Sequence, residues 1–126
     1  MRAVHELGLA TEILRSCRAH LGDPPGRLTR VRLAVGELSA VEPELLRSAW
    51  HALIEGSAHA GAALEIEWRR ARQVCARCGE APERSPGAWW PRCPRCGGSL
   101  AIEGGQELDL LELSYEPRAA REEVTP

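Results

Sequence analysis

The residues best suited to chemistry in this 126-residue chain are two pairs of cysteines. Cys75 and Cys78 form one CxxC pair, Cys93 and Cys96 form the other, and fourteen residues separate the pairs. A glycine follows each pair, which lets the backbone turn with positive φ and aim amides at the sulfurs. Four thiolates at this spacing make a closed tetrahedral site, and soft thiolate ligands favour zinc. Because such a site leaves no open position for a substrate, the pattern predicts a structural zinc ion.

The composition indicates the cellular compartment in which these cysteines would function. No apolar run is long enough for a signal peptide or a membrane span, so we expect a cytoplasmic protein without a membrane partner. Paired CxxC motifs in that setting are typical of metal ligands rather than disulfides. A redox protein of the thioredoxin kind would show one CxxC at a helix start. We find neither a catalytic Ser/His/Asp or Cys/His set nor a phosphate-binding glycine loop, and therefore expect no enzyme.

The elements that must position these ligands alternate between helix and strand. Apolar residues at three- and four-residue steps predict a first helix with Leu7, Ala10, Leu14, Cys17 and Leu21 as its buried stripe. Strict alternation predicts strands, and Ser39 with Glu42 resembles a capping box before a second helix. The predicted order is a helix over residues 5–21, a strand over 28–35, a helix over 43–55, a strand over 64–68 and, beyond the cysteines, a strand over 108–115.

This order predicts an α+β fold: a small three-stranded sheet with two helices, plus an inserted zinc-ribbon-like module. Residues 1–72 and 106–116 would form the α/β domain, 73–105 the zinc-binding domain and 117–126 a disordered tail. The strand–helix–strand unit should form a right-handed crossover. The module contains little apolar material, so zinc must supply much of its folding energy.

Other residues that could do chemistry have simpler interpretations. Cys17 lies on the apolar stripe and should be a small buried hydrophobe. Glu37 should make a local hydrogen bond in a turn, and Trp89 and Trp90 should pack over the cysteine pairs. Among the histidines, we expect His20 and His51 to be solvated, and we find no partner for His59, which lies in a loop.

Short segments along the chain resemble the HypA/HybF family of hydrogenase nickel-insertion proteins. The resemblance covers roughly residues 5–115 and rests on His5-Glu6-Leu7, Gly36-Glu37-Leu38-Ser39, Glu42-Pro43-Glu44-Leu45, Ile54-Glu55-Gly56-Ser57, Leu64-Glu65-Ile66-Glu67 and the two cysteine pairs. It implies a metallochaperone whose α/β domain binds nickel and whose inserted zinc domain is structural. It also implies delivery of Ni(II) to the large subunit of [NiFe] hydrogenase together with a HypB-type GTPase, and some members also serve urease.

The resemblance assigns nickel to His5, with Glu6 contributing through its backbone or by supporting a ligand. Ni(II) with nitrogen donors favours square-planar geometry, which an imidazole and neighbouring deprotonated amides can supply. The first turn of a helix has amides without intrahelical partners. Without the resemblance, a single exposed histidine at a helix start would usually be polar surface. We expect the helix face with Leu9, Glu12 and Ser16 to lie opposite the core and to meet the GTPase.

The alternative is a zinc-ribbon protein that binds nucleic acid. Between residues 69 and 96 there are seven arginines and two glutamates, and Trp89 and Trp90 could stack on bases. This local excess of +5 falls to +3 once zinc with four thiolates contributes −2. The net charge of the chain is only −2, so we rank nucleic acid below nickel as a ligand.

The start of the chain departs from the family pattern. Members of the family normally begin Met-His-Glu, whereas this chain begins Met1-Arg2-Ala3-Val4-His5-Glu6. Either the extra residues are a real extension, or translation begins at Val4 from a GTG codon read as Met. The arginine-rich, lysine-free composition suits a GC-rich genome and favours the second interpretation, which would place the chain's amine beside His5 as a nitrogen donor.

Overall fold

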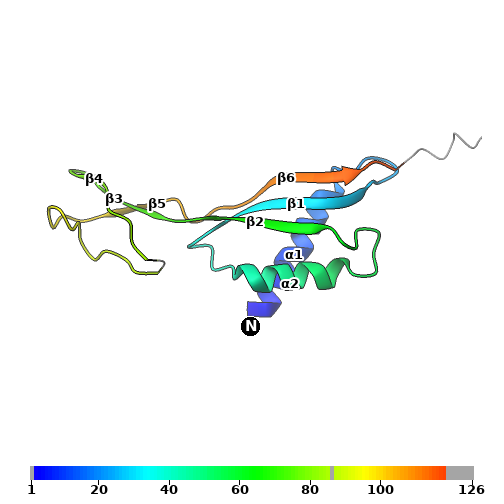
Figure 1. Cartoon of the computed structure of the whole chain (residues 1–126), viewed down its shortest axis with the longest axis horizontal. Coiled ribbons are helices and arrows are strands. Elements are labelled where there is room, and N and C mark those ends of the chain that lie inside the picture. The colour runs from blue at the N-terminus through cyan, green and yellow to red at the C-terminus, as the bar shows by residue number, and fades with distance from the viewer. Residues whose placement is uncertain (1, 86, 119–126) are drawn as a thin grey trace, which may run out of the picture.

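Two helices cover one face of a three-stranded sheet, and a second small sheet extends from one end of it (Figure 1). This computed structural model describes residues 2–85 and 87–118, with side chains from His5 onward. The elements are α1 Arg2–Arg18, β1 Arg27–Gly36, α2 Pro43–Ile54, β2 Ala63–Arg69, β3 Arg72–Cys75, β4 Gly79–Glu80, β5 Ala101–Glu103 and β6 Leu108–Glu116. The predicted α+β fold with an inserted module is confirmed. Met1 and most of the predicted tail, from residue 119, lie outside the described residues.

The main sheet has the order β2-β1-β6. β1 pairs in parallel with β2 through the α2 crossover and antiparallel with β6. The module therefore leaves from one edge strand and returns into the other, on the two sides of β1. Two residues join β2 to β3, and residues 104–107 join β5 to β6. Both connections lie at the same end of the sheet, where β1 also ends (Figure 1).

The hydrophobic core lies between the main sheet and the two helices. Trp50 and Leu46 of α2 are fully buried there, and the indole N–H of Trp50 donates to the carbonyl of Ala62 at 3.0 Å. Cys17 is also fully buried, as predicted, and burial raises the pKa of its thiol to about 11. Within the described residues, no helix is both long and apolar enough to cross a membrane.

The predicted stripe on α1 is wrong at its N-terminal end. Leu7 is 46% exposed, and the buried row instead begins at Glu6, which is fully buried, and continues through Ala10 and Cys17. These positions are separated by four and seven residues, the spacing of one helix face. Leu9 is half-buried and packs against the core, so it does not lie on the face opposite the core as expected.

The predicted capping box before α2 is also wrong, because the N-cap residue is Glu42. The Glu42 side chain accepts from the backbone N–H of Glu44 at 3.4 Å, and Pro43 occupies the first helical position. Ser39 shapes the preceding turn instead: its hydroxyl donates to the carbonyl of Gly36 at 2.8 Å and accepts from the N–H of Val41 at 3.3 Å.

Candidate metal centre

The four paired cysteines come together in the small sheet, which has the order β4-β3-β5. Cys75 ends β3, Cys78 lies in the turn to β4, and Cys93 and Cys96 lie in the loop before β5. Their sulfur atoms all lie within 4.8 Å of one another, and those of Cys75 and Cys96 are 3.6 Å apart. Zn–S bonds of about 2.3 Å in a tetrahedron would place sulfurs about 3.8 Å apart. The cluster therefore has the dimensions that one metal ion requires.

The glycines after each pair have the conformation expected from the sequence. Gly79 has a φ of 86° and Gly97 a φ of 76°, both in the region that favours glycine. The turn at the second pair brings the N–H of Gly97 to the carbonyl of Cys93 at 2.7 Å and the N–H of Gly98 to the sulfur of Cys96 at 3.4 Å. Backbone amides thus support the second pair as predicted.

Backbone amides also lower the pKa of one thiol in each pair. Hydrogen bonds from the N–H groups of Cys78 and Arg77 lower the pKa of the Cys75 thiol to about 6. Hydrogen bonds from the N–H groups of Arg95 and Cys96 lower the pKa of Cys93. By contrast, hydrogen bonding to Cys96 and burial raise the pKa of Cys78 to about 12. A divalent cation would supply the positive charge that allows all four sulfurs to ionise together.

His5 lies on the exposed side of α1. Unlike the four cysteines, it is not held within a cluster of potential metal ligands in the described part of the chain. Its side chain is 56% exposed, and its Nδ1 lies 3.9 Å from Oε2 of Glu6. Among the described residues, the four cysteines are the sole group of three or more potential ligands within metal-binding distance. Because α1 begins at Arg2, the amide of His5 lies at the limit of the helix's first four N–H groups and the amide of Glu6 lies beyond them. Amide ligation of nickel would therefore require the first turn of α1 to open.

Glu6 has a structural role that the sequence did not indicate. Its Oε2 accepts a 2.9 Å hydrogen bond from the backbone N–H of Glu42, the N-cap residue of α2, while Oε1 is buried without a hydrogen-bond partner among the described residues. The positive end of the α2 dipole favours a carboxylate at this place. The contact joins the helix that carries His5 to the start of α2. The sequence signal that could have indicated this role is an acidic residue at a position of α1 that shares a helix face with core residues.

The other histidines differ from one another in burial. His20 and His51 are exposed, as predicted. His59 is buried, and its Nδ1 accepts a 3.1 Å hydrogen bond from the backbone N–H of Leu28. Burial, followed by the charges of Arg18 and Arg27, lowers the pKa of this imidazole. His59 therefore holds the loop before β2 against the start of β1 as a neutral acceptor.

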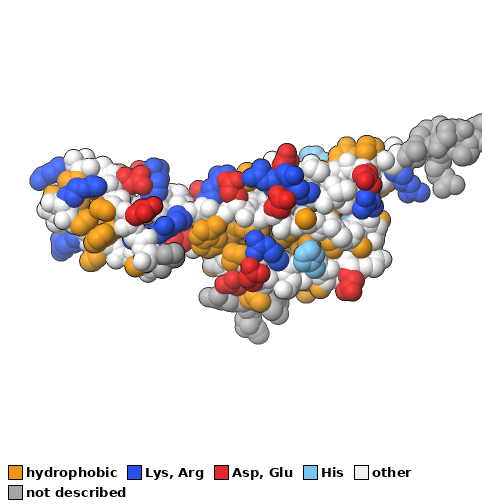
Figure 2. Space-filling model, viewed as in Figure 1, with side chains coloured by type: hydrophobic (Ala, Val, Ile, Leu, Met, Phe, Trp, Pro, Cys, Tyr) orange, Lys and Arg blue, Asp and Glu red, His pale blue; other side chains and the backbone are white. Residues whose placement is uncertain are grey.

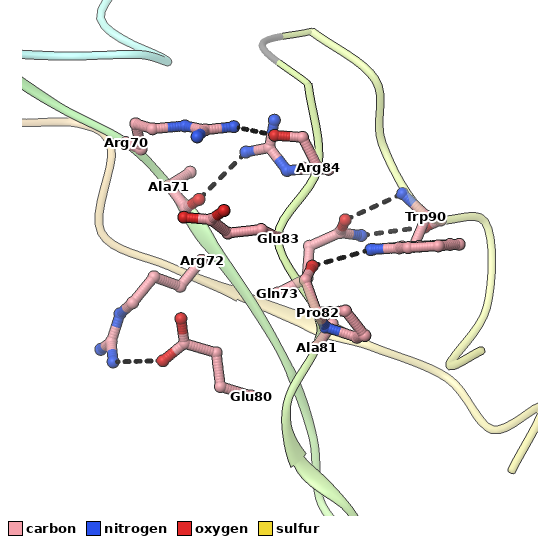
Figure 3. A pocket seen from close by; sticks show the side chains of 10 residues that line it. All are labelled: Arg70, Ala71, Arg72, Gln73, Glu80, Ala81, Pro82, Glu83, Arg84 and Trp90. Atoms are coloured by element: carbon pink, nitrogen blue, oxygen red, sulfur yellow. Dashed lines mark hydrogen bonds and ion pairs between the residues drawn. The ribbon is translucent and has the colours of Figure 1, made fainter. Parts of the chain in front are cut away.

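The two module tryptophans contact the segment before them in the chain. The guanidinium of Arg84 lies over the Trp89 ring at 3.7 Å. The indole N–H of Trp90 donates to the carbonyl of Pro82 at 3.0 Å, and the Gln73 amide exchanges two 2.9 Å hydrogen bonds with the Trp90 backbone (Figure 3). The expected packing of these rings over the cysteine pairs stays a prediction.

Five of the seven arginines between residues 69 and 96 make ion pairs or hydrogen bonds within the protein. Arg84 is buried in an ion pair with Glu37, Arg72 bridges Glu80 and Glu103, and Arg69 pairs with Glu67. Arg70 donates to the carbonyl of Arg84 (Figure 3), and Arg95 donates to the carbonyls of Cys78 and Glu80. Figure 2 shows basic and acidic side chains intermixed over both sheets on the face in view. These contacts weaken the argument for a nucleic-acid surface.

The fold and the four-cysteine cluster define a small α+β protein with an inserted metal-binding module. Residues 4–115 match the family model described as "Hydrogenase/urease nickel incorporation, metallochaperone, hypA". The chain therefore belongs to the HypA family of metallochaperones.

Individual relatives agree with this assignment. The chain is 34% identical to hydrogenase maturation factor HypA of Albidiferax ferrireducens over 115 residues, 90% of this chain and 100% of that protein. It is 35% identical to the factor of the same name from Moorella thermoacetica, over 86% of this chain and 98% of that protein. The solution structure of the Ni metallochaperone HypA from Helicobacter pylori matches with a TM-score of 0.56 and 25% identity, covering 90% of this chain and 98% of that one.

Proposed function

We propose that this protein binds Ni(II) and delivers it during maturation of [NiFe] hydrogenase, with zinc as a structural ion and without catalytic turnover. The observation that carries the proposal is the combination of a four-thiol cluster with an exposed His5 beside Glu6, in a chain that matches a nickel-incorporation family over residues 4–115. Residues 1–72 and 106–116 would handle nickel, and residues 73–105 would bind zinc.

Nickel would bind at His5, where the imidazole is open to solvent and to a partner protein. The nearby Glu6 carboxylate is occupied by the N–H of Glu42, so Glu6 would supply its backbone amide or orient the first turn rather than act as a side-chain ligand. A site that forms only when this turn opens can also release its cargo, because closing the helix restores the amide hydrogen bonds.

Zinc is the metal that fits the cysteine cluster. Cys75, Cys78, Cys93 and Cys96 offer four soft donors at tetrahedral spacing, and all five cysteines of the chain are free thiols. The ion would hold the module together and leave no position open for substrate. Since the thiols must stay reduced to bind it, we place the protein in the cytoplasm.

The proposed partners follow from family membership. Nickel held at a surface residue must pass directly to another protein, and we propose a HypB-type GTPase and the hydrogenase large subunit for these roles. Exposed Leu7, two residues from His5, provides apolar surface for such a contact. Nucleic acid is not proposed, because Arg70, Arg72 and Arg84 already have partners within the protein.

A calorimetric Ni(II) titration of zinc-loaded protein tests the proposal. His5→Ala should abolish stoichiometric nickel binding and leave zinc at about one ion per chain. His20→Ala, another exposed histidine of the N-terminal segment, is the matched control and should bind nickel normally. Wild-type nickel affinity in His5→Ala would refute the site, and full zinc content in Cys93→Ala would refute the assignment of the cluster.

A further inference from the structure

An almost buried ion pair joins the two sheets. Glu37 follows β1 in the α/β domain, and Arg84 lies in the module loop between β4 and Cys93. The side chains are only 10% and 7% exposed. Nη1 and Nη2 of Arg84 donate to the two carboxylate oxygens at 3.0 and 2.8 Å, a bidentate arrangement. The expectation of a local hydrogen bond for Glu37 is therefore wrong, because its main partner lies 47 residues away.

Further contacts complete the pair on both sides. Glu37 also accepts from the backbone N–H of Ala71 at 3.0 Å and of Gly87 at 3.4 Å. Arg84 donates additionally to the carbonyl of Ala71 at 3.0 Å, and its guanidinium covers the Trp89 ring. The hydrogen bond from Arg84 is the largest cause that lowers the pKa of Glu37 to about 2. Such a fully engaged pair is costly to break from one side.

Near the ion pair, the backbone at Gly36 and Gly105 is packed too closely to accommodate any residue other than glycine. Three hydrogen bonds tie the end of β1 to the end of β2 and to the connection between β5 and β6: Glu37 N–H to the Arg69 carbonyl at 2.8 Å, Gly36 N–H to the Glu107 carbonyl at 2.7 Å and Leu38 N–H to the Gly105 carbonyl at 2.6 Å. A Cβ at Gly36 would overlap the backbone of Gly105. Gly105 itself has a φ of 85°, and a Cβ there would lie 2.5 Å from that of Ala71.

We propose that Glu37 and Arg84 form a clasp that fixes the four-cysteine module on the α/β domain, so that both sheets move as one rigid body. A hydrophobic interface is not what holds the junction: Leu38 and Ile102, the apolar side chains that line its open groove, are 37% and 54% exposed. The polar clasp and the glycine contacts supply the rigidity instead.

The clasp also reaches toward His5. The loop that begins at Glu37 ends at Glu42, whose N–H is held by Glu6. One end of this loop is therefore fixed by the module and the other by the helix that carries His5. The clasp proposal is independent of the proposed nickel site. Its test measures only the orientation of the module relative to the α/β domain.

The test is NMR residual dipolar coupling on the zinc-loaded full chain. In the wild type, backbone couplings from β1, β2 and β6 and those from β3 and β5 should fit one common alignment tensor. In Glu37→Gln the Arg84 charge loses its partner, so the module should require a separate, smaller tensor. The N–H of Ala71 should also exchange roughly tenfold faster, because its acceptor changes from a carboxylate to a weaker, neutral amide oxygen.

Glu103→Gln is the matched control, because it breaks an exposed pair with Arg72 that joins β3 to β5 within the small sheet. It should keep the common tensor. Arg84→Lys retains the charge but not the bidentate fork, and it carries the same test if Glu37→Gln does not fold or load zinc. A common tensor in whichever clasp variant folds, or two tensors in the wild type, would overturn the proposal.

Discussion

Two neighbouring residues at the start of α1 meet opposite environments. His5 is exposed, whereas the carboxylate of Glu6 is buried against the N-terminus of α2 and accepts from Glu42. Successive helix residues point about 100° apart, so one can serve a transient ligand while the next anchors the fold. Variants of the two residues should therefore separate nickel handling from stability.

At the residue scale, Glu6→Ala should lower the free energy of unfolding by about 1–3 kcal/mol, because it removes the carboxylate that accepts from the part-buried N–H of Glu42. His5→Ala should change it by less than about 0.5 kcal/mol, since His5 is exposed. Urea unfolding of zinc-loaded samples measures both values. Equal losses in the two variants would contradict the anchoring role of Glu6.

The buried imidazole of His59 should make stability depend on pH. Its pKa in the folded protein lies below the ordinary 6.5, so folding favours the neutral form. The stabilisation is complete above about pH 6.5 and is lost as the pH falls from there to the folded-state pKa. His59→Gln keeps an acceptor for Leu28 but does not titrate.

Urea midpoints at about pH 7.5 and about pH 5.5 test this, since that interval contains the ordinary histidine pKa. The wild type should lose more stability than His59→Gln on acidification. Protonation of the cysteine cluster affects both proteins alike and cancels in the comparison. Parallel pH profiles would show that His59 does not contribute.

At the scale of single elements, the same substitution should have opposite effects in α1 and β1. A Cβ at Gly8 would meet no described atom within 4 Å apart from its own stretch of helix, so Gly8→Ala should stabilise the helix by about 0.5–1 kcal/mol. A Cβ at Gly36 would overlap Gly105, so Gly36→Ala should destabilise the protein by about 1–3 kcal/mol. Thermal unfolding of both variants checks the signs, and a neutral Gly36→Ala would show that the junction can yield.

At the scale of the whole molecule, the two sheets have very unequal cores. Fifteen buried residues form the cluster between the main sheet and the helices. In the cysteine module, from residue 73 to 105, the buried hydrophobic residues are Cys75 and Cys93 alone among those described. A chelator should therefore unfold the module first, because its stability depends on the metal.

Hydrogen exchange before and after chelation measures this difference. Amide protection should fall across residues 73–103 and persist in β1 and its two neighbouring strands. Restoring zinc should restore protection in the module. Loss of protection throughout the chain would mean instead that the module and the α/β domain fold as a single cooperative unit.

Patterns of residues that lie close together in the sequence were sufficient to predict the main elements and the cysteine cluster. Apolar periodicity predicted both helices and the three main strands, and the CxxC spacing predicted the cluster, because each signal comes from residues close in sequence. The same local rules gave wrong predictions at two residues. Ser39 makes a turn hydrogen bond instead of capping α2, and Leu7 is exposed because Glu6 takes the buried position on α1.

Only the tertiary structure revealed the pairs that hold these elements together. Glu6 meets Glu42 across 36 residues, His59 meets Leu28 across 31, and Glu37 meets Arg84 across 47. A buried polar side chain is stable only if a partner satisfies it. In these pairs the partner is a backbone amide or a guanidinium, placed by the packing of strands and helices, so no local pattern in the sequence identifies it. The sequence alone thus determined the main elements and the four-cysteine cluster, and the packing decided which charges and amides join the elements.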